Sequence, residues 1–199
     1  MGRMTQQTME KIAYLMRGMP SCGKSYTARK LAGDRGFIAE TDKYFYTECG
    51  DDATKFDYDA EKMPAARDWN FKQFCAAINA GVSPIVVDRG CGLTLESRRF
   101  AQYAFDHGYQ VQLAFPESPW WNDVQVLLKY KPHTLPILYA WAEKLSKMSR
   151  KTHRVPVKTI KHWMERWNPN VTIEDILNFE PPSITTKKQS TSSQAVHPS

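Results

Sequence analysis

The 199-residue sequence has no apolar segment long enough to cross a membrane. Its longest uncharged stretch, residues 73–87, contains Asn, Gly and Pro and is shorter than the roughly 20 residues that a spanning helix needs. The N-terminal apolar run covers only residues 12–16 and is closed by Arg17, which argues against a secretory signal. Gln6 breaks the myristoylation pattern that Met1-Gly2 would open. We therefore expect a cytoplasmic or nuclear protein without a membrane partner.

Cysteine and histidine are also sparse. The four cysteines, at positions 22, 49, 75 and 91, contain no C-x-x-C pair, and the five histidines show no metal-ligand spacing. A disulfide framework is therefore not expected, and a reducing compartment is the simpler setting. The sequence predicts no bound zinc.

Charge is unevenly distributed along the chain. Residues 40–62 contain eight acidic and three basic residues, whereas residues 144–166 contain eight basic and one acidic, within a net charge of +6. A basic segment that closes over anionic phosphates would show this asymmetry, and so would a helix with a solvated basic face. The last twenty residues are polar, so we expect one domain over residues 1–179 and a disordered polar tail over residues 180–199.

One short motif carries a specific chemical meaning. Gly18, Gly23, Lys24 and Ser25 fit the spacing G-x-x-x-x-G-K-[ST]. Glycines allow successive backbone N–H groups to turn inward around an anion, Lys24 supplies a charge for the outer phosphates, and the Ser25 hydroxyl can bind Mg²⁺. The motif therefore predicts nucleotide contacts from the following residues: Gly18, Met19, Pro20, Ser21, Cys22, Gly23, Lys24, Ser25 and Tyr26.

The sequence around this motif supports the interpretation. The apolar run 12–16 is short enough for a buried parallel strand, and residues 24–32 form a helical segment that stops at Gly33. A strand, a loop and a helix in this order place a phosphate at the positive N-terminus of the helix.

Strand and helix patterns alternate along the remaining chain. This alternation predicts an α/β protein with a three-layer P-loop NTPase fold: a parallel sheet of about four to five strands, helices on both faces, and a helical lid. Further strands are expected at residues 36–39, 84–88 and 109–115. Helices are expected at residues 65–80, 93–107, 119–129, 135–148 and 156–167.

Two acidic residues follow predicted strands and should lie at the same edge of the sheet as the glycine motif. Asp88 follows Ile85-Val86-Val87 and is a candidate Mg²⁺ ligand, although an Asp at a strand end can also cap the next turn. Asp42 follows the second strand and is a candidate general base for an attacking hydroxyl, although it can also be an N-cap.

Several segments together resemble a known family. They are L-x-R-G-M-P-S-C-G-K-S, T-D-K-Y-F-Y, A-R-D-W-N and S-P-I-V-V-D, with a W-x-x-D-V-x-x-L segment from Trp120 and H-R-V-P from His153. Over about residues 12–167 the chain is similar to the P-loop kinases grouped with polynucleotide 5′-hydroxyl kinases, and most similar to their Nedd-four-binding-protein-two-like branch.

This resemblance implies ATP and Mg²⁺ as cofactors and phosphoryl transfer to a hydroxyl. It matches Asp42 to the catalytic base of the family, Lys24 to the lysine of the phosphate loop, and Arg150 to an arginine of a basic lid. In such a lid, Arg154 would be a further nucleotide contact.

The chain departs from the family pattern at three places. Phe45 stands where the phage polynucleotide kinase has an arginine for the acceptor phosphate. Asp88-Arg89-Gly90-Cys91 replaces D-[TN]-[TN]-N, and about eighteen residues, 131–148, are inserted before the lid. The inserted stripe of Leu135, Leu138, Tyr139, Ala142 and Leu145 predicts packing into a core or lid, with a partner surface as the alternative.

The sequence therefore predicts an ATP-dependent kinase whose acceptor is a hydroxyl, with the 5′-OH of a nucleic acid as the leading candidate. A kinase for a small molecule such as a sugar, nucleoside or antibiotic is the alternative. An ATP-binding adaptor without efficient transfer is an alternative of another class.

Overall fold

A computed structural model describes residues 10–47, 58–150 and 154–180 of the chain. Within these residues the elements are, in order, β1 (Ile12–Met16), α1 (Lys24–Ala32), β2 (Phe37–Glu40), α2 (Lys43–Thr47), α3 (Met63–Asn79), β3 (Ile85–Asp88), α4 (Thr94–Asp106), β4 (Gln110–Ala114), α5 (Pro119–Lys129), α6 (Lys131–Ser149), α7 (Val157–Arg166) and α8 (Ile173–Leu177). Among the helices of these ranges, none is long and apolar enough to cross a membrane.

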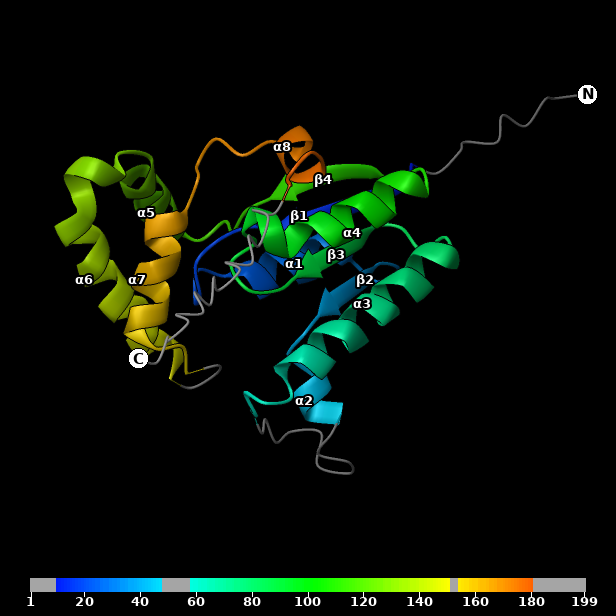
Figure 1. The fold of residues 1–199 in the computed structure, drawn as a ribbon, viewed down its shortest axis with the longest axis horizontal. Coiled ribbons are helices and arrows are strands. Elements are labelled where there is room, and N and C mark those ends of the chain that lie inside the picture. The colour runs from blue at the N-terminus through cyan, green and yellow to red at the C-terminus, as the bar shows by residue number, and fades with distance from the viewer. Residues whose placement is uncertain (1–9, 48–57, 151–153, 181–199) are drawn as a thin grey trace, which may run out of the picture.

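The four strands form one parallel sheet in the order β2-β3-β1-β4 (Figure 1). In its register, Ala13 of β1 lies beside Ile85 of β3 and Val111 of β4, and Glu40 of β2 lies beside Asp88 of β3. Because all strands run the same way, their carboxyl ends meet at a single edge. The residues that follow β1, β2 and β3 are therefore collected at this edge, as the sequence predicts.

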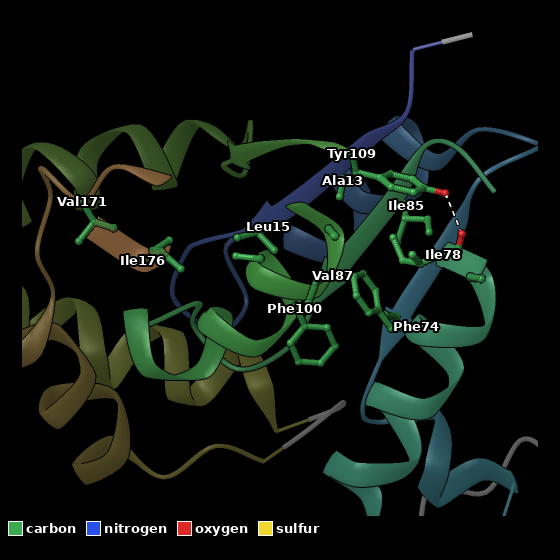
Figure 2. Close-up of a cluster of buried hydrophobic side chains, with 14 residues drawn as sticks. Ala13, Leu15, Phe74, Ile78, Ile85, Val87, Phe100, Tyr109, Val171 and Ile176 are labelled. Atoms are coloured by element: carbon green, nitrogen blue, oxygen red, sulfur yellow. Dashed lines mark hydrogen bonds between the residues drawn. The ribbon is translucent and has the colours of Figure 1, made fainter. Parts of the chain in front are cut away.

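Helices cover both faces of the sheet. Strand side chains alternate between the faces, so Met16 and Val86 meet Ala28 and Ala32 of α1, whereas Leu15 and Val87 point the other way. Figure 2 shows this second face: Phe74 of α3 and Phe100 of α4 lie close together, and Ile176 of α8, in the same buried cluster, lies on the side of Leu15. The predicted three-layer α/β arrangement is thus confirmed.

The core of the second face is rich in aromatic rings. The centroids of Phe74 and Phe100 are 5.0 Å apart with their planes at 70°, an edge-to-face contact of the kind that aromatic rings prefer. The ring of Tyr109 is buried in the same core, and its hydroxyl donates a hydrogen bond of 2.8 Å to the carbonyl of Val82. These contacts tie the loop before β3 to the start of β4.

Helices α5, α6 and α7 form a separate cluster, here called the lid bundle, beside the carboxyl edge of the sheet (Figure 1). Its buried side chains include Trp121, Val124, Leu128, Leu138, Ala142, Leu145, Ile160 and Met164. The stripe predicted in the inserted segment therefore packs into a core: Leu138, Ala142 and Leu145 are fully buried.

The element bounds differ from the sequence predictions in a few places. Helix α6 begins at Lys131 and not at residue 135, because Pro132 occupies the first turn, where a backbone N–H has no helical acceptor anyway. The helix continues through Pro136. The short helices α2 and α8 were not predicted, since five residues are too few to show helical periodicity. Residues 181–199 of the predicted tail lie outside the described residues.

Candidate functional site

The segment that joins β1 to α1, residues 18–25, is here called the glycine loop. The Gly18 N–H donates to the carbonyl of Cys91 at 3.1 Å, and a Cβ at Gly18 would lie 2.7 Å from a ring carbon of Pro116. Gly23 has φ +90° and serves as the N-cap of α1. Both positions therefore need glycine, one for space and the other for its left-handed backbone.

The first turn of α1 meets the requirements of an anion site. Its first N–H groups have no acceptor within the helix, and Gly23 provides no side-chain cap. The first turn contains no acidic residue, so the positive end of the helix dipole is not neutralised there. Lys24 donates from Nζ to the Met19 carbonyl at 3.0 Å, which holds its ammonium against the loop. Ser25 is half-buried beside it. These residues fit a phosphate group.

The outer turn of the glycine loop packs against the lid bundle. Met19 and Cys22 are fully buried and belong to the core of that bundle. Burial raises the pKa of the Cys22 thiol to about 12, so this cysteine stays protonated at neutral pH. Pro20 is also buried, whereas the Tyr26 side chain is 68% exposed. The loop residues predicted from the sequence thus divide between the bundle core and the surface.

Carboxylates lie at the same edge of the sheet. Asp88 is buried at the end of β3, and Glu40 lies beside it at the end of β2. Burial, and then the negative charge of Asp88, raise the pKa of the Glu40 carboxyl, with Asp42 adding to the effect and Lys43 opposing it. The structure therefore brings Glu40, Asp42 and Asp88 into electrostatic range of one another.

Glu40 was not predicted as a site residue. The period of two along β2 contains the signal, because Ile38 faces α1 and Glu40 shares its face. Among the described residues, no group of three His, Cys, Asp or Glu side chains could hold a metal alone. Mg²⁺ is usually bound by one or two carboxylates together with substrate phosphates, and Asp88 and Glu40 are neighbouring carboxylates that could take part in such a site.

Asp42 occupies the position directly before α2. It is half-buried, and its carbonyl accepts a hydrogen bond from the Phe45 N–H at 3.1 Å. Both sequence interpretations of Asp42, a base at the sheet edge and a residue at a helix start, remain compatible with this placement. The neighbouring Thr41 is buried and accepts a hydrogen bond from Asn70 of α3 at 3.1 Å, which fixes the backbone between β2 and α2.

Phe45, at the position where the phage polynucleotide kinase has an arginine, is buried. It is 1% exposed and lies edge-on to Tyr44, with ring centroids 5.6 Å apart. Its ring centroid also lies 5.3 Å from that of Tyr58. This position therefore belongs to the packing of α2 and cannot offer a cation to an acceptor.

Arg89 lies immediately after Asp88. Its Nη1 donates to the carbonyl of Glu96 at 2.8 Å, and its guanidinium lies 5.5 Å from the ring centre of Phe100. Burial lowers the pKa of Arg89, and the charge of Glu96 opposes that shift. Arg89 lines a groove of about 460 Å³ between α3 and α4, together with Phe71, Leu95, Glu96, Arg98, Arg99, Gln102, Tyr103 and Asp106.

Arg17 joins three separate parts of the site and was not predicted. It is 1% exposed; its Nε donates to Gly92 at 3.0 Å and one terminal nitrogen donates to Asn168 at 3.1 Å. Its guanidinium lies 4.2 Å from the ring centre of Trp167, within the range of a cation–π contact. Burial lowers its pKa to about 10, so Arg17 stays charged at neutral pH. It ties the glycine loop to the turn after β3 and to the end of α7.

The two candidate arginines of the lid flank the connection between α6 and α7. Arg150 follows α6, and Arg154 has φ +50°; both side chains are exposed. The described ends of this connection are joined by two serines: Ser146 donates to the Val155 carbonyl at 2.7 Å, and the Ser149 hydroxyl accepts from the Val155 N–H at 2.9 Å. Lys151 and His153 lie outside the described residues.

No family model matches the chain. The chain is similar to human NEDD4-binding protein 2, with 27% identity over 173 residues that make up 86% of this chain. The matched segment covers 8% of that protein, so the chain spans less than a tenth of the length of this relative.

Proposed function

We propose that the protein binds ATP with Mg²⁺ at the glycine loop and transfers the γ-phosphoryl group to a hydroxyl acceptor. The observation that carries this proposal is the geometry of the loop. Gly18 is pressed against Pro116, and the left-handed Gly23 opens an uncapped helix. This pairing leaves backbone N–H groups and the Lys24 ammonium for the phosphates of a nucleotide.

Each residue of this site then has a defined role. Lys24 and the N–H groups of the first turn of α1 hold the phosphate oxygens, and the Ser25 hydroxyl and the Asp88 carboxylate bind the cation. Bound Mg²⁺ would neutralise charge between the β- and γ-phosphates. Glu40 adds a second carboxylate beside Asp88, and the exposed arginines of the lid supply positive charge from outside.

Asp42 is the proposed general base. In the reaction the acceptor oxygen forms a bond to the γ-phosphorus, the bond from phosphorus to the β–γ bridging oxygen breaks, and ADP leaves. The acceptor hydroxyl proton passes to the Asp42 carboxylate. The position of Asp42, beside the ends of β2 and β3 and half-exposed, suits a group that must meet both the γ-phosphate and the solvent-borne acceptor.

The preferred acceptor is the 5′-hydroxyl of a nucleic acid. The resemblance of the motifs to polynucleotide kinases supports this choice. Arg89, which follows Asp88 directly, and Arg98 and Arg99 of α4 line the groove between α3 and α4 and supply cations that could meet a backbone phosphate. The buried Phe45 favours a second candidate, a small-molecule kinase, because the arginine with which the phage polynucleotide kinase binds its acceptor is absent from this position.

The direct test is transfer of label from γ-labelled ATP. Single-stranded oligonucleotides with free 5′-hydroxyls, a nucleoside, a sugar and an aminoglycoside serve as acceptors, and Asp42→Asn serves as the control for chemistry. We expect labelled oligonucleotide with the parent protein and a decrease of about two to four orders of magnitude with Asp42→Asn, the usual size of a general-base effect. A protein that binds ATP but labels none of these acceptors would support the adaptor alternative.

Salt dependence separates the two kinases. A polynucleotide that neutralises lysines or arginines releases counterions, so its KM should rise steeply between low and moderate salt. A small uncharged acceptor should give a nearly flat line. Unlabelled oligonucleotides together with a flat line for a small acceptor would reject the nucleic-acid acceptor and keep the small-molecule kinase.

A further inference from the structure

Ser21, in the outer turn of the glycine loop, has an unfavourable backbone conformation. Its φ is +59°, in the left-handed region that glycine adopts readily and residues with a Cβ adopt rarely. Because this conformation is unfavourable for a serine, contacts with other parts of the molecule must stabilise it.

Those contacts come from the start of α5. The indole Nε1 of Trp120 donates to the Ser21 carbonyl at 3.0 Å, and the Ser118 hydroxyl donates to the Cys22 carbonyl at 2.8 Å. Ser118 is itself fixed, because its side chain accepts the N–H of Trp121 as the N-cap of α5. Two successive loop carbonyls are thus turned toward the lid bundle.

The direction of these carbonyls sets the direction of the loop N–H groups. In a planar trans peptide the N–H points opposite to the C=O. With the Ser21 and Cys22 carbonyls pointing to α5, the N–H groups of Cys22 and Gly23 point away from it. The Cys22 N–H donates to the Met19 carbonyl at 3.4 Å and so closes the turn from Met19 to Cys22, and the Gly23 N–H follows this turn. The hydrogen bonds from α5 therefore orient the inner surface of the glycine loop.

We propose that Trp120 is a positioning residue for the nucleotide: its indole N–H holds Ser21 in the left-handed conformation and so keeps the Met19–Cys22 turn in the shape that directs the following Gly23 N–H toward the phosphates. Trp120 does not contact the nucleotide in this account. The proposal rests on the proposed function of the loop, but the conformation that it describes exists without a ligand.

Packing in the lid bundle supports the contact between Trp120 and the glycine loop. Met19 and Cys22, on either side of Ser21, are buried in the same core as Trp121, and Trp120 packs against that core. The outer turn of the loop therefore has side-chain packing and two carbonyl hydrogen bonds to one helix. A change at Trp120 should reach the loop directly.

The test uses the full chain, two single variants, the double variant and a control variant. Trp120→Phe keeps an aromatic ring and removes the N–H donor, and Ser21→Gly removes the penalty of the left-handed conformation. The dissociation constant of Mg·ATP is measured by calorimetry for the parent, both single variants and the double variant. Trp163→Phe is the matched control, because Trp163 of α7 packs against the same core.

We expect Trp120→Phe to weaken Mg·ATP binding by about tenfold, the effect of losing one orienting hydrogen bond. In the Ser21→Gly background the same change should weaken Mg·ATP binding by less than about threefold, because glycine adopts the left-handed conformation without the hydrogen bond from Trp120. Trp163→Phe should bind as the parent does. Equal losses in the Ser21 and Ser21→Gly backgrounds, or no loss at all, would overturn the proposal.

Hydrogen exchange of the nucleotide-free protein separates this proposal from the proposed function. Trp120→Phe should speed exchange of the amides in a peptide covering residues 18–26, and Trp163→Phe should not. If the parent fails to bind Mg·ATP yet Trp120→Phe speeds this exchange, Trp120 does hold the loop and the proposed nucleotide function is wrong. If Trp120→Phe leaves this exchange unchanged, the proposed role of Trp120 is wrong, whether or not the parent binds Mg·ATP.

Discussion

The sheet core and the lid bundle contribute different candidate site residues. The sheet core is built from strand residues and from α1, α3, α4 and α8, and its edge carries the carboxylates Glu40, Asp42 and Asp88. The lid bundle carries the exposed Arg150 and Arg154. The candidate carboxylates thus lie at the edge of the sheet core, and the candidate lid arginines lie beside the lid bundle.

The glycine loop contacts both the sheet core and the lid bundle. The Gly18 N–H forms a hydrogen bond with the carbonyl of Cys91, just after β3, whereas Met19 and Cys22 are part of the core of the lid bundle. In this arrangement the position of the bundle and the shape of the loop depend on each other. We therefore expect a packing defect in the lid bundle to weaken nucleotide binding, and a packing defect deep in the sheet core to leave it unchanged.

Matched core truncations test this difference most strongly. Leu138→Ala in the lid bundle and Ile78→Ala in the sheet core each remove a buried side chain and should each cost about 2–5 kcal/mol of unfolding free energy. Only Leu138→Ala should also weaken Mg·ATP binding, measured by calorimetry below the unfolding transition.

The milder pair Ile160→Val and Ile176→Val repeats the comparison if an alanine variant does not fold. Each should cost about 0.5–1.5 kcal/mol, again with a binding effect in the lid bundle alone. A loss of affinity of the same size from both bodies would show that the loop is not specifically coupled to the lid.

The positive charge of the lid gives the next effect. Arg150→Ala should lower kcat by about ten- to a thousandfold with little change in ATP affinity, as an interaction strongest at the transition state would. Arg150→Lys should recover part of the rate, since lysine lacks the planar fork that matches phosphate oxygens. Arg166→Ala, at an exposed arginine of α7, is the control. Steady-state kinetics showing the same kcat for Arg150→Ala and the control would remove Arg150 from the reaction.

A smaller effect, on the pH dependence of stability, is expected from Glu40 at the edge of the sheet. Because the pKa of Glu40 is raised above its ordinary value of 4.5, the folded protein binds this proton more tightly than the unfolded chain. Stability from this group is therefore complete below about pH 4.5 and is lost as pH rises through the folded pKa. Glu40→Gln should raise the unfolding midpoint at pH 7 and leave it unchanged at pH 4. A lower midpoint at pH 7 would contradict this sign.

Much of the fold follows from local sequence patterns. Apolar runs closed by Arg17 or Asp88 indicate buried strands, and helical stripes such as Leu138, Ala142 and Leu145 indicate packed helices. The motif from Gly18 to Ser25 needs only local spacing, so its loop geometry could be predicted. The catalytic and cofactor roles of Asp42, Arg150, Arg154 and the loop residues stay predictions.

The missed residues act over long distances in the chain. Arg17 contacts positions 75 and 151 residues away, and Trp120 reaches the loop across 99 residues. Periodicity describes neighbours within one element and contains no information on such contacts. The buried state of Phe45 was hidden for the same reason, because it depends on how α2 packs.

Binding of Mg·ATP by the parent protein and by Lys24→Ala tests the central claim most directly. Lys24 lies against the loop and packs into neither core, so its loss should leave the unfolding midpoint of the free protein nearly unchanged. The parent should be stabilised by saturating Mg·ATP, and so should a Lys72→Ala control at an exposed lysine of α3. Lys24→Ala should show little or no such stabilisation. A midpoint that rises with Mg·ATP as much in Lys24→Ala as in the parent, or in neither, would contradict the assignment of the glycine loop as the nucleotide site.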